Sequence, residues 1–262
     1  MKRRIKYNKS KILSRLPISK ILPNLATISS LFFGLMQIKF ALSNQWENAL
    51  LCLVGAAFLD ATDGRLARLF NSCSRFGAEL DSLSDFAVFG ISPAIVMYIY
   101  SLSEFGRFGW IVCVFFSICM CLRLARFNTH DIENIKTPLS GKFFTGVPAP
   151  AGAVLGIIPI IGYNAFNSQI FGSPYICSIT MIISAILLIS RIPTFSIKKI
   201  HIKREQFTSF LLFVIVSFGI IFTLTWKAFF IIAILYFISI FFSYSKAKKI
   251  LEVENQVDNN NE

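Results

Sequence analysis

The chain has 262 residues, of which 55% are hydrophobic and 28 are phenylalanine, and its mean hydropathy is +0.64. This apolar content exceeds what a soluble core can bury, so an ordinary water-soluble globular protein is excluded and a bilayer is expected to act as solvent. The formal net charge is +12, but the basic residues are scattered over many short segments, which argues against a nucleic-acid partner.

The amino-terminal segment, residues 1–22, contains eight lysines and arginines and no acidic residue. It has no apolar stretch that ends in a small-residue cleavage site, so no removable signal peptide is predicted. Residues 9–22 combine basic and apolar side chains and are expected to form an amphipathic helix at the membrane surface.

Eight apolar windows follow this segment, and each is close to the roughly 20 residues that a helix needs to cross a bilayer. They lie at residues 23–43, 48–70, 77–101, 108–127, 146–164, 171–190, 207–224 and 228–245. Because lipid cannot satisfy the backbone groups of an open sheet, the predicted fold class is all-α, a polytopic membrane bundle of about eight transmembrane helices.

The distribution of lysine and arginine predicts the orientation of this bundle. The basic residues gather in the loops that share a side with the amino-terminal segment, so both termini and these loops are expected in the cytoplasm. The predicted organisation is a basic segment at 1–22, a transmembrane domain at 23–245 and a polar tail at 246–262. Glycines 146, 152 and 156 form a stripe of small residues that suits close helix packing.

The densest charge cluster, residues 60–85, lies in the midst of these apolar windows. Its residues fall on two helix faces with a polar turn between them. The first face contains Asp60, Asp63, Gly64, Ala67 and Arg68. The second face, with spacings of three, four and four residues, contains Ser74, Gly77, Asp81 and Asp85. Two antiparallel helices would therefore present four carboxylates to one another near the inner membrane surface.

Four neighbouring carboxylates repel one another strongly unless a cation compensates their charge. Their oxygen atoms suit a hard divalent ion such as Mg²⁺ or Mn²⁺. Gly64 and Gly77 leave room for a bulky group, and Arg68 offers a positive charge to a phosphate oxygen. The pattern therefore predicts a site where two metal ions neutralise a diphosphate and assist an in-line displacement.

The cluster has two other interpretations. Structural ion pairs with Arg65, Arg68 or Arg75 are the simpler one, but they do not require acids at such regular spacing beside paired glycines. A divalent-cation transporter would need a polar path to the outer side. The outer halves of the adjacent windows, CLVGAAF and FAVFGISPAIVMY, have almost no polar residues, so metal-dependent chemistry is preferred.

The cluster resembles the motif D-x-x-D-G-x-x-A-R-x8-G-x3-D-x3-D of the CDP-alcohol phosphatidyltransferase family, and every fixed position is filled. The resemblance implies a core of six transmembrane helices, to which this chain adds two. It implies that Asp60, Asp63 and Asp81 bind two divalent metal ions, and that Asp85 both contacts metal and acts as base toward the acceptor alcohol. The residues implied for binding CDP-diacylglycerol are Pro23, Asn24, Thr27, Asp60, Gly64, Ala67, Arg68, Ser74 and Gly77.

Three further segments, RLARFN at 123–128, FTGVPAPAGA at 144–153 and SRIPTFSIK at 190–198, resemble the branch of that family whose acceptor is L-serine. This resemblance implies an enzyme of the cytoplasmic (inner) membrane that makes phosphatidylserine and CMP at a site facing the cytoplasm. Arg123, Arg126 and Asn128 are expected to engage serine, although both arginines could instead only mark topology. Glycerol 3-phosphate or inositol phosphate stay open as acceptors, and dimerisation is common in the resembling family.

Overall fold

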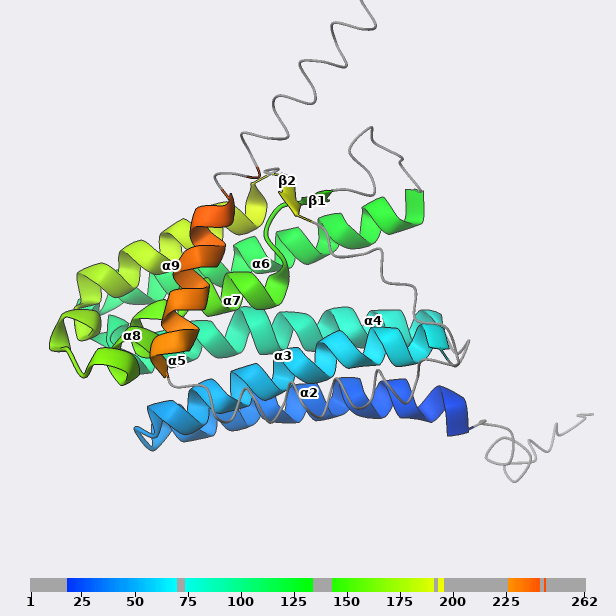
Figure 1. The fold of residues 1–262 in the computed structure, drawn as a ribbon, viewed down its shortest axis with the longest axis horizontal. Helices are drawn as coiled ribbons and strands as arrows, with labels where there is room; N and C mark the ends of the chain where they lie inside the picture. The colour runs from blue at the N-terminus through cyan, green and yellow to red at the C-terminus, as the bar shows by residue number, and fades with distance from the viewer. Residues whose placement is uncertain are drawn as a thin grey trace, which may run out of the picture.

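The computed structural model describes residues 18–69, 74–133, 143–190, 193–195, 226–240 and 243 (Figure 1). These residues form a bundle of helices with a ribbon of two short strands beside it. The helices are α2 (Ile18–Leu42), α3 (Trp46–Leu69), α4 (Arg75–Asp85), the π-helical turn η1 (Phe86–Ile91), α5 (Ser92–Tyr100), η2 (Leu102–Phe105), α6 (Arg107–Glu133), α7 (Ala149–Gly156), α8 (Ile158–Phe166), η3 (Gln169–Gly172), α9 (Pro174–Ile189) and a helix at Trp226–Ile240.

Helices α2 and α3 form an antiparallel hairpin and lie side by side along their length (Figure 1). The turn between them depends on Asn44, whose φ of 56° is a left-handed conformation that asparagine tolerates. The hairpin is also joined by a hydrogen bond of 3.0 Å from Ser30 Oγ to the carbonyl of Ala56. This pairing holds the amino-terminal half of α2 against the end of α3 where the charge cluster begins.

Helices α4, η1 and α5 follow one another as a single apolar rod from Arg75 to Tyr100. Close packing attaches this rod to α2, because a Cβ at Gly34 would lie 2.8 Å from Val88 Cγ2. Ser92 Oγ also lies 2.7 Å from both the Gly34 carbonyl and Gln37 Oε1. The rod is therefore fixed against α2 just beyond the π-helical turn that follows Asp85.

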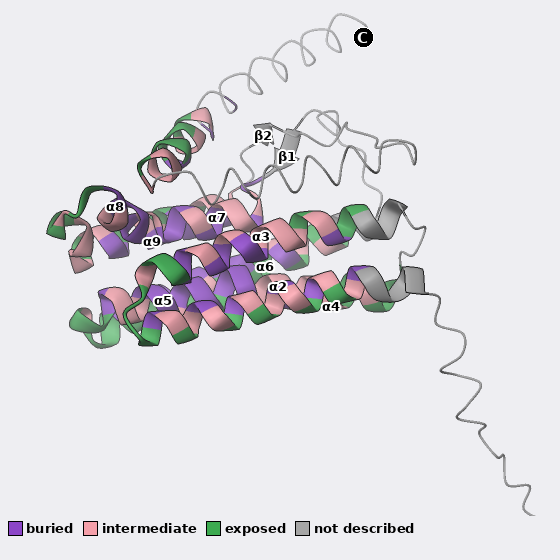
Figure 2. Cartoon of the chain, turned by 60° about the horizontal axis from the view of Figure 1, so that its bottom comes forward, coloured by how far each residue is buried: buried purple, intermediate pink, exposed green. Residues whose placement is uncertain are grey.

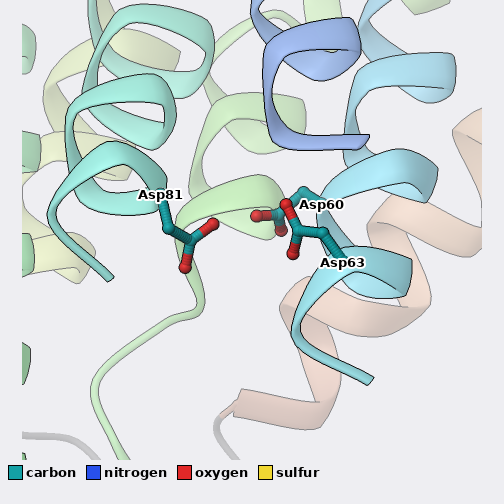
Figure 3. Close-up of side chains that lie close together, drawn as sticks. All are labelled: Asp60, Asp63 and Asp81. Carbon is teal, nitrogen blue, oxygen red and sulfur yellow. The ribbon is translucent and has the colours of Figure 1, made fainter. Parts of the chain in front are cut away.

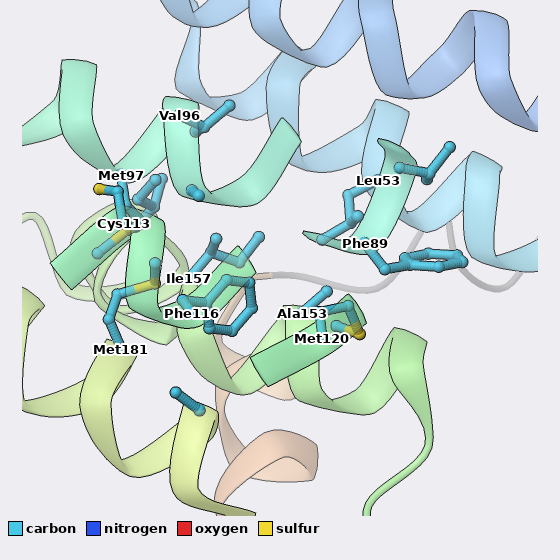
Figure 4. Close-up of a cluster of buried hydrophobic side chains, with 14 of the residues drawn as sticks. Leu53, Phe89, Val96, Met97, Cys113, Phe116, Met120, Ala153, Ile157 and Met181 are labelled. Atoms are coloured by element: carbon cyan, nitrogen blue, oxygen red, sulfur yellow. The ribbon is translucent and has the colours of Figure 1, made fainter. Parts of the chain in front are cut away.

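The apolar core lies where η1, α5, α6, α7 and α9 meet, and Phe89, Phe116, Met120 and Met181 are among its fully buried side chains (Figure 4). The predicted packing role of the small-residue stripe is confirmed at two positions. A Cβ at position 152 would lie 2.4 Å from Leu188 of α9, and one at position 156 would lie 3.2 Å from both Phe116 and Met181. Large side chains of the neighbouring helices therefore pack against glycine.

The window predicted as one span at 146–164 is two helices, α7 and α8, bent by 54° at Ile157. Pro159 lies in the first turn of α8, where its missing N–H is harmless, but it could not continue α7. The strands β1 (Phe143–Thr145) and β2 (Pro193–Phe195) form an antiparallel ribbon with Phe143 opposite Phe195. The all-α prediction is thus confirmed for the described residues, and the ribbon of two three-residue strands is a small addition to the helical bundle.

The number of membrane spans agrees only in part with the sequence. Within the described residues, three helices are long and apolar enough to cross a bilayer, or four if α7 and α8 count as one. These spans are Pro23–Leu42, Arg75–Tyr100 and Arg107–Thr129. Helix α9 and the helix Trp226–Ile240 are apolar but shorter, and the window at 207–224 lies outside the described residues. The count of eight and the orientation stay predictions.

Exposed apolar side chains on the outer faces fit a lipid environment. Buried residues lie inside the bundle and exposed residues on its outside and at its ends (Figure 2). On α2, Leu25, Ile28, Phe32 and Leu35 are each more than half exposed and recur every three to four residues. They form one stripe along the helix, which is the pattern expected of a lipid-facing surface. The segments 1–17 and 244–262 lie outside the described residues.

Candidate active site

Three carboxylates from two helices meet near one end of the bundle (Figure 3). Asp60 and Asp63 extend from α3 and Asp81 from α4, and one oxygen of each lies within 4.8 Å of those of the other two. Asp63 is only 4% exposed. The predicted meeting of two helical faces is therefore observed, and it brings three like charges together at a site where Asp63 is buried and Asp60 and Asp81 are partly buried.

The fourth aspartate, Asp85, differs in position. It is the last residue of α4, one turn beyond Asp81, and it precedes the π-helical turn η1. Its carboxyl group contacts that of Asp60 at hydrogen-bond distance. Asp85 is not part of the group formed by Asp60, Asp63 and Asp81. Asp85 therefore lies beside the three converging carboxylates and contacts one of them.

Helix α2 forms one wall of the site through Thr27. The Thr27 hydroxyl donates a hydrogen bond of 2.7 Å to Asp63 Oδ2 and also lies 3.2 Å from the Pro23 carbonyl. Ser84 of α4 donates in turn to the Thr27 carbonyl at 3.2 Å. Ser84 is not predicted from the sequence. The only feature of the sequence that could have indicated it is its position between Asp81 and Asp85. This chain of contacts orients Asp63 from the α2 side.

The start of α4 lies against the start of α2. Ser74 is the N-cap of α4, and its hydroxyl accepts a hydrogen bond of 3.0 Å from the Gly77 N–H. A Cβ at Gly77 would lie 3.1 Å from both Ser74 Oγ and Asn24 Oδ1. Five of the residues predicted to bind the nucleotide lipid therefore gather in one place: Pro23, Asn24, Thr27, Ser74 and Gly77.

The last turns of α3 carry the remaining predicted binding residues. A Cβ added at Gly64 would meet nothing within 4 Å, so the glycine leaves open space beside Asp63. Ala67 and Arg68 belong to the helical backbone of α3, but their side chains lie outside the described part of the structure. Their contacts with a substrate stay predictions.

The converging carboxylates fit a divalent cation. They offer only oxygen donors, which hard divalent ions prefer. Asp81 Oδ1 is buried and has no hydrogen-bond partner, an arrangement that costs free energy unless another group satisfies it. The three residues that could hold such an ion are Asp60, Asp63 and Asp81.

The residues predicted to engage serine lie at the end of α6 and have different surroundings. Arg126 donates to the carbonyls at the end of α9, at 2.7 Å to Ile189, 3.4 Å to Leu188 and 3.3 Å to Ser190. Gly146 packs beside it with a φ of 82°, and a Cβ there would lie 2.8 Å from the Ser190 carbonyl. Arg126 therefore satisfies the carbonyl groups at the carboxyl end of α9. Its spacing from Arg123 in the sequence did not indicate this role.

Arg123 and Asn128 lie closer to the aspartates. Arg123 Nε donates to the carbonyl of Val147, and its guanidinium interacts electrostatically with Asp85. Asn128 Nδ2 donates a hydrogen bond of 2.9 Å to Ser82 Oγ, beside Asp81. The structure thus brings these two of the three predicted residues to the aspartate site. Described parts of the three resembling segments also meet, because Arg123 donates to Val147, just before α7, and Arg126 donates to Ser190, just after α9.

Comparison with known proteins gives two findings. A family profile described as CDP-alcohol phosphatidyltransferase matches residues 20–190. The chain is 41% identical over 187 residues to a CDP-diacylglycerol–serine O-phosphatidyltransferase of Mycobacterium tuberculosis, covering 70% of this chain and 62% of that protein. It is 36% identical over 193 residues to a protein of the same name from Helicobacter pylori, covering 74% of this chain and 79% of that protein. Compared with the mycobacterial relatives, the chain spans less than two thirds of their length.

Proposed function

Because the chain belongs to the CDP-alcohol phosphatidyltransferase family, we propose that it transfers the phosphatidyl group of CDP-diacylglycerol to the hydroxyl of L-serine, giving phosphatidylserine and CMP. The observation that carries this proposal is the convergence of Asp60, Asp63 and Asp81 from two helices. Serine as the acceptor is supported by the two relatives, which are both named CDP-diacylglycerol–serine O-phosphatidyltransferase.

The metal site of this proposal consists of Asp60, Asp63 and Asp81, with Asp85 adjacent. Two Mg²⁺ or Mn²⁺ ions bound there would neutralise the diphosphate and stabilise the charge that develops at phosphorus. Thr27 would keep Asp63 oriented, because its hydroxyl holds one of the two carboxylate oxygens. The open space at Gly64 would admit the diphosphate beside these carboxylates.

The reaction moves one group and one proton. The serine oxygen forms a bond to the β-phosphorus of CDP-diacylglycerol, and the bond from that phosphorus to the oxygen of CMP breaks. The proton of the serine hydroxyl passes to Asp85, which lies beside Asp60 but outside the converging group of three. A base within hydrogen-bond reach speeds such an attack because a primary alcohol is a weak nucleophile near neutral pH.

The nucleotide and the serine would bind at different ends of this site. The cytidine nucleotide would lie near Pro23, Asn24, Ser74 and Gly77, which gather at the starts of α2 and α4. The serine carboxylate would bind the terminal amino groups of Arg123, next to Asp85. Arg126 donates to the end of α9 instead, so we assign it a role in the fold. Asn128 would support α4 through Ser82.

The site lies at the end of the bundle where α2 starts, and the basic amino-terminal segment precedes that helix. By the positive-inside rule this end would face the cytoplasm, which is where a soluble acceptor such as serine is available. The proposed location is therefore the inner membrane, with the nucleotide head of CDP-diacylglycerol at the surface and its acyl chains in lipid. A homodimer stays a prediction.

The proposal is tested with the purified chain in detergent or nanodiscs, CDP-diacylglycerol, Mn²⁺ and radiolabelled L-serine. Thin-layer chromatography should reveal labelled phosphatidylserine, which disappears with excess chelator and returns with added Mn²⁺ or Mg²⁺. Parallel reactions contain glycerol 3-phosphate or inositol phosphate in place of serine. A product with one of these alone would correct the acceptor and keep the reaction class. Absence of any product, with cation flux into liposomes, would favour the transporter.

A further inference from the structure

The helix Trp226–Ile240 lies beyond residue 190, where the match to the family ends. It nevertheless contacts the bundle, where it crosses the long helices at a steep angle (orange in Figure 1). Near its start, Trp226 Nε1 donates a hydrogen bond of 2.9 Å to Glu47 of α3. Further along, the ring of Phe230 meets Phe166 and Phe171 edge to face. The first half of the helix therefore contacts the start of α3, the end of α8 and η3.

Its last turns reach the segment that holds Arg123. Ile240 is buried in a cluster with Val147 and Leu155, and Tyr236 packs against the same cluster. The carbonyl of Val147 accepts the hydrogen bond from Arg123 Nε. Tyr236 and Arg123 are also electrostatic neighbours. Val147 thus joins a side chain of the outlying helix to the arginine beside Asp85.

The hydroxyl of Tyr236 is buried and has no hydrogen-bond partner. Burying a hydroxyl without a hydrogen-bond partner costs free energy. We therefore expect another group to complete the hydrogen bond of the Tyr236 hydroxyl. Arg123 uses Nε for the protein backbone, and in the part of the chain that the structure describes its two terminal amino groups have no hydrogen bond. The Tyr236 hydroxyl and the terminal amino groups of Arg123 are therefore neighbouring donors, and Arg123 in turn neighbours the Asp85 carboxylate.

We propose that Tyr236 determines the acceptor, by donating its hydroxyl to the carboxylate of L-serine together with the terminal amino groups of Arg123. The proposal rests on the function proposed above. Serine carries its carboxylate on the carbon next to the one that bears its hydroxyl. When Arg123 and Tyr236 hold the carboxylate, the hydroxyl is directed toward Asp85. An amino alcohol without a carboxylate loses both contacts.

The test compares Tyr236→Phe and Tyr236→His with the unchanged protein. Phenylalanine keeps the ring that packs against Val147 and removes only the donor, whereas histidine retains a ring N–H. KM and kcat are measured for L-serine, for serinol, which has a second hydroxymethyl group in place of the carboxylate, and for CDP-diacylglycerol. Tyr98→Phe is the matched control, because Tyr98 contacts Trp110 on the outer side of α5.

For Tyr236→Phe we expect the KM for serine to rise about tenfold to a hundredfold, as for a lost hydrogen bond to a charged group. The KM for CDP-diacylglycerol should stay within about twofold, because the lost hydrogen bond contacts only serine. The preference for serine over serinol should fall by the same factor as serine binding. Tyr236→His should recover part of that preference, and Tyr98→Phe should change none of these constants.

Two results would overturn the assignment. If the preference for serine over serinol is unchanged while both activities fall together, Tyr236 only supports the fold. If every constant is unchanged, its hydroxyl has no role in binding. A failure of the proposed function is seen separately, because the unchanged protein would then make no phosphatidylserine, or would use a different acceptor before any substitution is compared.

Discussion

Two charged regions face each other at one end of the bundle, the aspartates of α3 and α4 and the arginines of α6. The three converging aspartates have few partners within the protein: Thr27 bonds Asp63, and one oxygen of Asp81 is buried without any hydrogen bond. The arginines, in contrast, donate to backbone carbonyls, and Arg126 reaches three of them at the end of α9.

This difference in hydrogen bonding distinguishes residues that bind a ligand from residues that stabilise the fold. The presence of charge alone does not make that distinction. A charged side chain whose hydrogen bonds are made inside the protein holds elements together. A cluster of like charges with buried, unused oxygen atoms costs free energy in the absence of a ligand, so it is expected where a ligand binds. Arg123 lies between these cases, since its Nε donates to the carbonyl of Val147 while its guanidinium interacts electrostatically with Asp85.

The largest effect is expected when the aspartate region loses a charge. Asp63→Asn keeps the shape and the contact with Thr27 but weakens an oxygen ligand of a divalent ion. We expect the rate at saturating substrates to fall about a thousandfold or more, since a bound metal supplies several kcal/mol of stabilisation. Initial rates across a Mn²⁺ titration measure both the loss and the shift in metal requirement.

The matched control is Glu79→Gln. Glu79 is an exposed acid on α4, two residues before Asp81 but outside the converging group. The same loss of charge there should leave the rate within about twofold, because an exposed charge is screened by solvent. Equal losses in both variants would mean that overall charge, and not the cluster, governs activity.

A second, somewhat smaller effect is expected at Asp85, which contacts Asp60 beside the converging group. Asp85→Asn removes basicity, and the rate should fall about a hundredfold to ten-thousandfold, the range typical of general base catalysis. A titration of CDP-diacylglycerol binding should be largely unchanged, whereas Asp81→Asn should weaken it. Binding lost together with rate would make Asp85 chiefly a metal ligand, and retained turnover would remove it from the mechanism.

The sequence predicted the helical bundle and the meeting of the carboxylates, because both follow from local periodicity. Spacings of three and four residues place Asp60 and Asp63, and likewise Asp81 and Asp85, on single helix faces, and a short polar turn can join only antiparallel neighbours. The bend at Ile157 was signalled by Pro159. The π-helical turn η1 had no signal, since FAVFGI reads as ordinary apolar helix.

Contacts between distant segments were not predictable in this way. The ribbon of β1 and β2 joins residues about fifty positions apart, and neither strand shows an alternating pattern that could be recognised in three residues. The use of Arg126 by the end of α9, and of Val147 by Arg123, depends on how helices pack. Periodicity gives the face of a helix but not its partner, so both arginines looked alike in the sequence.

The smallest change in turnover is expected at Arg126. Comparison with Arg123 tests the difference between residues that bind a ligand and residues that stabilise the fold. Arg123→Ala should raise the KM for serine about tenfold to a hundredfold, because the carboxylate loses a charged donor. Arg126→Ala should leave that KM within about twofold and instead lower the stability of the solubilised protein by about 2 kcal/mol or more, since its donors satisfy the carbonyls of Ile189 and Ser190. Thermal unfolding and serine saturation curves, recorded on both variants, distinguish the two roles.

The opposite assignment would follow if Arg126→Ala raised the KM for serine as strongly as Arg123→Ala while unfolding at the same temperature as the unchanged protein. Arg126 would then belong to the acceptor site, and its contacts with α9 would matter little to the fold.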